Sequence, residues 1–147
     1  MAGHGKRKPR GVEFFVFISE QWLLVSVLLV LIYVFTWREK QKGGKGVSAQ
    51  EATRMLNSDS AVLVDVREAA DFKAGHIVDA VNIPHNKLAE RFVELEPHRE
   101  KVVVLVDKMG QHVGNAGRAL REKGFDVRRL DGGMAEWQNQ NLPVVKK

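Results

Sequence analysis

The 147-residue chain contains no cysteine. Disulfides, cysteine-ligated metal sites, redox pairs and every mechanism that depends on a thiolate are therefore excluded together. The sequence also has no internal repeat and no low-complexity run. Its length allows one domain plus an additional segment.

A basic surface is missing from most of the chain. Residues 46–147 contain fifteen Lys and Arg and fifteen Asp and Glu, so their formal net charge is zero. The whole excess of +5 lies in residues 1–45, which hold eight basic and three acidic side chains. A domain that binds nucleic acid needs a basic face, so no nucleic-acid partner is expected. The excess flanks a hydrophobic segment, where Lys and Arg set membrane topology and attract anionic lipid head groups.

That hydrophobic segment, residues 14–37, predicts a single transmembrane helix in a lipid bilayer. Its most apolar part, Trp22–Trp37, would span roughly 24 Å as a helix, and extension back through Phe17 reaches the ~30 Å of a hydrocarbon core. Glu20 then lies near the interface, where it stays hydrated. A buried core helix would show a polar face, and a signal peptide would have a shorter apolar run and a cleavage site of small residues. We therefore expect a retained anchor.

The segments that flank this span are short and basic. Residues 1–13 are expected to be disordered, and residues 38–46, rich in glycine, are expected to be a flexible linker. Four basic side chains precede the span and four follow it, so the positive-inside rule does not choose an orientation.

Residues 47–147 alternate between strand and helix patterns, which predicts an α/β domain with a mainly parallel sheet. A capping box, Ser48 to Glu51, begins a helix that runs to about Leu56. Further helices are expected over residues 87–95, 113–123 and 134–139. Strands are expected over residues 61–65, 78–82, 102–106 and 126–130.

The stretch Val102–Leu120 organises the expected domain. Five apolar residues, Val102–Val106, predict a strand buried on both faces, and a helical pattern begins at Val113. A strand followed by a short loop and a helix N-terminus directs several backbone N–H groups at one point, where the helix dipole is also positive. This arrangement predicts an anion-binding loop, with Asp107 at its first position.

Two further motifs accompany this loop. In the first, Gly75 permits a tight turn, and His76 is either a ligand or base, or a hydrogen-bonded structural residue. The structural interpretation is favoured because no second ligand lies at metal-binding spacing. The second motif turns the chain through a glycine pair into a helix that packs a tryptophan. The motif residues are Asp65, Arg67, Gly75, His76, Asn82, Pro84, Gly132, Gly133 and Trp137.

Together these motifs resemble the rhodanese-like domain family over roughly residues 47–145. The resemblance implies a three-layer α/β domain with a five-stranded, mainly parallel sheet and an active loop after the central strand. With the preceding span, the chain resembles small bacterial inner-membrane rhodanese-domain proteins. That resemblance implies a single-pass protein of the inner membrane, with the domain on the cytoplasmic side.

The same resemblance exposes a departure at the loop. Active members carry a cysteine at its first position, which holds the transferred sulfur, and here Asp107 stands there. Lys108 and His112 fall where active members often have arginine. The residues of this vestigial loop are Asp107, Lys108, Met109, Gly110, Gln111 and His112. A carboxylate cannot form and release an S–S bond, and the rhodanese-fold phosphatases use the same cysteine.

Two roles are open to Asp107. Aspartyl-phosphate chemistry usually needs Mg²⁺ and companion carboxylates, which this loop does not supply. Alternatively, the carboxylate occupies the loop's own N–H groups as a cap, an interaction typically worth ~0.5–2 kcal/mol.

The leading hypothesis is a membrane-anchored, catalytically inactive rhodanese-like domain that binds or scaffolds a protein partner. That partner would lie at the membrane and includes the case of another integral membrane protein. No cofactor and no metal are expected. The alternatives are an enzyme with residual anion or phosphoryl chemistry, or a sulfurtransferase-related role, at Asp107–His112, and a purely structural subunit of a membrane complex.

Overall fold

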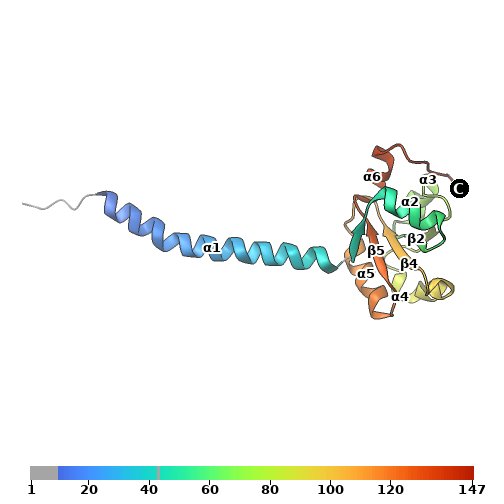
Figure 1. Cartoon of the computed structure of the whole chain (residues 1–147), viewed down its shortest axis with the longest axis horizontal. Coiled ribbons are helices and arrows are strands. Elements are labelled where there is room, and N and C mark those ends of the chain that lie inside the picture. The colour runs from blue at the N-terminus through green and yellow to red at the C-terminus, as the bar shows by residue number, and fades with distance from the viewer. Residues whose placement is uncertain (1–9, 43) are drawn as a thin grey trace, which may run out of the picture. The chain divides into compact units, whose positions relative to one another are not determined.

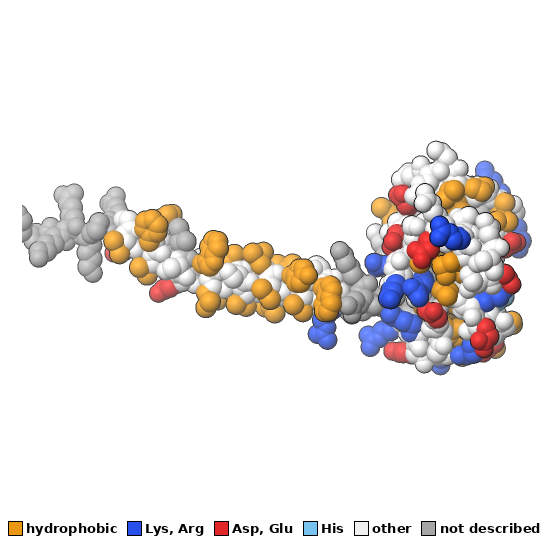
Figure 2. Space-filling model, viewed as in Figure 1, with side chains coloured by type: hydrophobic (Ala, Val, Ile, Leu, Met, Phe, Trp, Pro, Cys, Tyr) orange, Lys and Arg blue, Asp and Glu red, His pale blue; other side chains and the backbone are white. Residues whose placement is uncertain are grey.

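The computed structural model describes residues 10–42 and 44–147, which form two compact units. The boundary between them follows Arg38, so the first unit holds most of helix α1, Arg10–Lys42, including the whole of the expected span. Within its stretch Gly11–Arg38, an 18-residue window has a mean hydropathy of 2.3, and the apolar side chains are exposed, as Figure 2 shows. Such a helix fits a membrane anchor and also a signal sequence. Residues 1–9 of the expected disordered segment lie outside the described residues, whereas residues 10–13 are helical.

The second unit is a three-layer α/β domain (Figure 1). Its five strands pair in the order β1-β5-β4-β2-β3, and every pair is parallel. The predicted fold class is therefore confirmed. In chain order the elements are β1 Lys45–Val47, α2 Ala49–Asn57, β2 Ala61–Asp65, α3 Ala69–Ala74, β3 Val81–Asn82, α4 Leu88–Arg91, the 3₁₀ helix η1 Phe92–His98, β4 Val102–Val106, α5 Val113–Glu122, β5 Val127–Leu130 and α6 Gly133–Asn139.

Strand β4 lies at the centre of the sheet and contributes to both cores. Because successive side chains of a strand point to opposite faces, Val103 and Leu105 enter one core while Val104 and Val106 enter the other. All four are fully buried. The continuous apolar run is thus the signature of a strand covered on both sides.

The two cores are closed by different helices, which Figure 1 shows on opposite faces of the sheet. Helices α4 and α5 cover one face, and α2 and α6 cover the other. The helical residues of the first core are Leu88, Leu95 of η1, Val113, Ala116 and Leu120. Those of the second are Ala49, Ala52, Met134 and Trp137. At the start of α2 the predicted cap is present, with the Ser48 hydroxyl accepting from the Glu51 N–H at 3.2 Å.

The structure differs from the predicted elements at four places. Of the expected linker, residues 38–46, residues 38–42 continue α1 and residues 45–46 belong to β1, which pairs with the distant β5. Helix α3 was not predicted. Strand β3 is two residues long, and the helix expected over residues 87–95 is a short α-helix followed by η1, which contains Pro97. Local patterns miss short elements of this kind because tertiary contacts stabilise them.

Candidate functional site

The loop Asp107–His112 connects β4 to α5 at the carboxyl edge of the sheet. Asp107 is 2% exposed, and its two carboxylate oxygens accept the backbone N–H groups of Gly110 and His112, the latter at 2.8 Å. Gly110 has a φ of +94°, a conformation that glycine adopts without strain. The Asp107 side chain therefore occupies N–H groups that would otherwise face an anion, as the capping hypothesis expected.

Helix α6 holds this loop from its other side. The N–H of Met134 donates to the carbonyl of Asp107 at 2.7 Å, and the N–H of Ala135 donates to the carbonyl of Lys108 at 3.0 Å. These donors are in the first turn of α6, whose N–H groups have no partner within the helix. The close approach depends on Gly133, because a Cβ there would lie 2.5 Å from the Asp107 carbonyl oxygen. Both Gly132 and Gly133 also have positive φ.

Two hollows flank Lys108, which lines both. The smaller, about 160 Å³, brings Glu68, Asp71 and His85 beside the loop. The larger, about 280 Å³, is lined by residues of α3, α6 and the loop. Arg67, and Asp71 of α3, line both hollows. Lys108 has no ion pair among the described residues. Met109 lines the larger hollow and is 62% exposed.

Sequence reasoning missed two partners of the loop. The rings of His85 and His112 stack with centroids 4.4 Å apart, and His85 is further held by its N–H, which donates to Val66 at 3.0 Å. Nothing in the pattern around His85 indicated this contact. The N–H groups of α6 were also missed, although the Gly132-Gly133 pair is a signal of close backbone approach.

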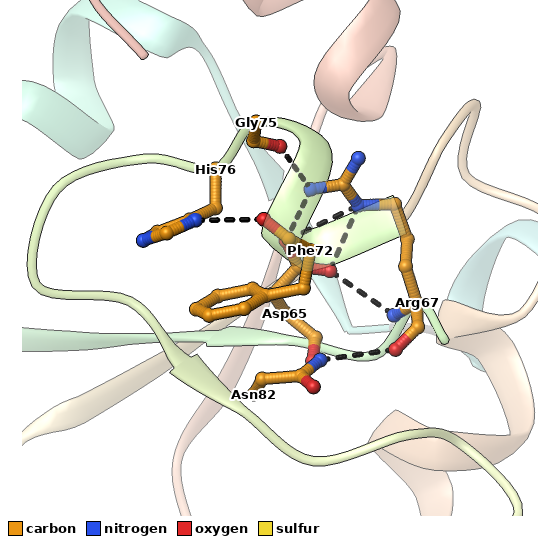
Figure 3. A network of polar contacts seen from close by, with 6 residues as sticks. All are labelled: Asp65, Arg67, Phe72, Gly75, His76 and Asn82. Atoms are coloured by element: carbon orange, nitrogen blue, oxygen red, sulfur yellow. Dashed lines mark hydrogen bonds and ion pairs between the residues drawn. The ribbon is translucent and has the colours of Figure 1, made fainter. Parts of the chain in front are cut away.

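The motif around Asp65 forms a separate buried network (Figure 3). Asp65 is fully buried, and Arg67 donates to it through its backbone N–H at 3.0 Å and through its guanidinium at 2.7–3.1 Å. The guanidinium also donates to the carbonyl of Gly75 at 2.8 Å. Asn82 donates to the carbonyls of Asp65 and Arg67, which fastens β3 to the turn. Every one of these contacts is internal to the fold.

His76 belongs to the same network. Its Nδ1 donates to the carbonyl of Phe72 at 2.7 Å, and the two rings stack at 3.8 Å. Its backbone pairs with Val145 in an antiparallel bridge. This environment agrees with the structural interpretation of His76. Among the described residues, no group of three His, Cys, Asp or Glu is placed to hold a metal ion.

The remaining motif residues lie where they support the loop or a core. Trp137 packs in the second core and donates its indole N–H to the carbonyl of Pro143 at 3.0 Å. Pro84 follows β3, and its carbonyl accepts from the N–H of Lys87 at 2.9 Å. The motif residues thus act as supports, most of them around the carboxyl edge of the sheet and Trp137 within the second core.

Comparison with known families identifies this architecture. Residues 48–140 match the model of the rhodanese-like domain. The chain belongs to the rhodanese-like domain family. It is 37% identical over 131 residues to the uncharacterized protein YibN of Escherichia coli K12, a match that covers 88% of this chain and 90% of YibN. It is 34% identical over 98 residues to the thiosulfate sulfurtransferase GlpE of Shewanella oneidensis, covering 66% of this chain and 95% of GlpE.

Solved structures agree with the family assignment. A rhodanese-related protein from Thermoplasma volcanium superimposes with a TM-score of 0.64 at 25% identity, covering 70% of this chain and 99% of that one. A thiosulfate sulfurtransferase from Pseudomonas aeruginosa gives a TM-score of 0.66 at 20% identity, covering 74% of this chain and 21% of that one; at that identity it shows the fold alone. Within the family, this member has the rhodanese fold and no cysteine.

We predict that Gly133→Ala destabilises the domain. The φ of +59° alone costs an alanine about 1–2 kcal/mol, and the contact with the Asp107 carbonyl adds to that cost. Gly114→Ala is the matched control, because a Cβ there meets no atom within 4 Å and alanine favours the helix by about 1 kcal/mol. Urea unfolding of residues 44–147 measures both. Equal stability of the two variants would contradict the close packing of α6 on the loop.

Proposed function

We propose that this protein is a membrane-anchored, catalytically inactive rhodanese-like domain that binds a protein partner through the Asp107–His112 loop. One observation carries the proposal: the Asp107 carboxylate is buried and bound to the loop's own N–H groups. The site therefore holds no thiolate, and the N–H groups of Gly110 and His112 are already occupied by the protein's own side chain. The exposed side chains around Asp107, Lys108 and Met109 among them, form a surface on which a protein partner can bind.

Sulfur transfer is disfavoured by the chemistry of Asp107. A persulfide needs a polarizable sulfur that can form and release an S–S bond, and the chain contains none. Phosphoryl transfer through Asp107 is disfavoured by the geometry. Glu68 and Asp71 do line the adjacent hollow, which the sequence did not predict, but both oxygens of Asp107 are engaged by backbone donors. Before Asp107 could attack a phosphoryl group, its hydrogen bonds from the Gly110 and His112 N–H groups would have to break.

A protein partner fits the surface around Lys108 and Met109. An exposed methionine adapts its flexible side chain to an irregular apolar partner, and the hollows on either side offer room for protruding side chains. The unpaired Lys108 ammonium favours a carboxylate in the partner. The Asp65 network and helix α6 keep the surface rigid, which reduces the entropy cost of binding.

Helix α1 is proposed as the anchor. The exposed apolar stretch Gly11–Arg38 is long enough for a hydrocarbon core, and a soluble protein rarely leaves so much apolar surface uncovered. The match to YibN extends over 88% of this chain, beyond the rhodanese-like region. We place the protein in a bacterial inner membrane with its domain on the cytoplasmic side.

We predict no turnover of thiosulfate and cyanide by the full-length protein in detergent, and no activity on a panel of phosphatase substrates. Asp107→Ala should expose the Gly110 and His112 N–H groups, so that thiosulfate binding appears by isothermal titration. The same variant should lose about 0.5–2 kcal/mol of stability. Asp126→Ala, which removes an exposed acid elsewhere, is the control. Turnover or tight thiosulfate binding by the unaltered protein would refute the capped site.

We predict that the protein extracted from membranes retains residues 1–38. An intact mass matching the full chain, together with resistance to carbonate extraction, establishes an anchor. A mass that lacks these residues establishes a cleaved signal sequence instead. A reporter fused after Lys147 and assayed from both sides of the membrane measures the orientation.

We predict that a photoreactive benzoylphenylalanine in place of Met109 crosslinks a discrete protein in intact membranes. The same group in place of Val93, which is 59% exposed on η1, should not. Replacing residues 1–42 with an unrelated span should preserve the Met109 product. If the Met109 crosslink is lost when the span is replaced, the partner binds helix α1 instead. If positions 109 and 93 give the same crosslinked product, the loop is not the contact surface.

A further inference from the structure

A cavity of about 370 Å³ lies at the amino edge of the sheet, away from the Asp107–His112 loop. It is lined by Asp59 and Ala61 at the start of β2, and by Lys101, which precedes β4. Because the strands are parallel, these residues and Asp107 lie at opposite ends of the sheet. The cavity is thus separate from the proposed partner surface, and its volume falls at the small end of ligand pockets.

The interior of this cavity is apolar and partly aromatic. Its walls come from α2 and β2, the turn before β3, the segment from His98 to Lys101, and the segment that includes and follows α6. The apolar lining includes Leu56, Leu63, Ile77, Val78, Trp137 and Leu142. Val78 is 54% exposed at the mouth, whereas Trp137 is buried. A ligand therefore needs an apolar body of about one ring system to fill the space.

The charged groups at the cavity give it a net negative charge. Lys101 and Asp59 form an ion pair at 2.6 Å, and the hydrogen bond from Lys101 holds the pKa of Asp59 below its usual range, so this pair is neutral overall. Asp79 is exposed, and its side chain has no hydrogen bond or ion pair in residues 10–42 and 44–147. One uncompensated carboxylate therefore faces an incoming ligand.

His98 also lines the cavity, from the segment that precedes β4. Its Nδ1 has no hydrogen-bond partner among the described residues, but that atom has almost no accessible surface and so does not face a ligand. Recognition therefore rests on the Asp79 carboxylate, which carries a negative charge and only accepts hydrogen bonds. That group matches a ligand that donates and carries a positive charge.

We propose that this cavity binds a small molecule with an apolar, ring-sized body and a protonated amine. The ring would pack against Ile77 and Trp137, and the ammonium group would pair with Asp79. The proposal does not depend on the function of the Asp107 loop. If the loop binds no protein partner, the cavity can still bind an amine. If the cavity binds no amine, the loop can still bind a protein partner.

Isoleucine methyl labelling tests this inference with built-in controls, because the chain has only four isoleucines. Ile77 lines the cavity, Ile83 is buried in the other core, and Ile18 and Ile32 belong to α1. The full-length protein is placed in phosphatidylcholine nanodiscs and titrated with tryptamine, then with indole-3-propionate, which has a similar body and the opposite charge. Tryptamine should shift the Ile77 methyl saturably and leave Ile83 unmoved. Changes at Ile18 or Ile32 report partition into lipid.

Two variants assign the recognition to the cavity. Asp79→Asn tolerates the φ of +60° and should weaken tryptamine binding about two- to fivefold, as expected for one exposed charge pair. Glu90→Gln removes an exposed acid from α4 and should change nothing. Val78→Trp should block the mouth and abolish the Ile77 shift, with the Ile83 signal confirming the fold. Equal binding of the acid and the amine, an unsaturable Ile77 shift, or an unchanged Asp79→Asn affinity would overturn the proposal.

Discussion

The buried carboxylate of Asp107 is the interaction on which the site depends. It follows the central strand, receives N–H groups from its own loop, and lies beneath the first turn of α6. Among the described residues it forms no ion pair, and its side-chain hydrogen bonds come from two backbone N–H groups of its own loop. The loop conformation places these donors, and the carboxylate in turn holds the loop in that conformation.

A second buried carboxylate, that of Asp65, has a different set of hydrogen-bond partners. Asp65 ends β2, which pairs directly with β4, and it is as buried as Asp107. Arg67 neutralises it and ties it to the turn at Gly75. A buried ion pair with all its hydrogen bonds made fixes geometry more than it adds stability. The two carboxylates thus hold adjacent strand ends in place, one through a cation and the other through backbone N–H groups.

The sequence predicted the parts of this arrangement that have local signals. The apolar run at β4, the capping box at Ser48 and the glycine pair before α6 each identified an element. The order of motifs carried the family resemblance and with it the five-stranded sheet. The capping role of Asp107 followed from its position between a strand and a helix. Each of these signals depends on residues close together in the chain, where spacing alone determines the geometry.

What the sequence did not reveal depends on contacts between distant segments. Strand β1 exists because Lys45–Val47 pairs with β5, more than eighty residues away. His85 meets His112, and Glu68 and Asp71 meet the loop, only once β2, β3 and β4 are aligned. The amino-edge cavity is assembled in the same way from four separate segments, none of which carries a ligand motif. In this fold the recognisable motifs mainly stabilise the loop at the carboxyl edge and the second core, so surfaces available for binding have to be found from the three-dimensional structure.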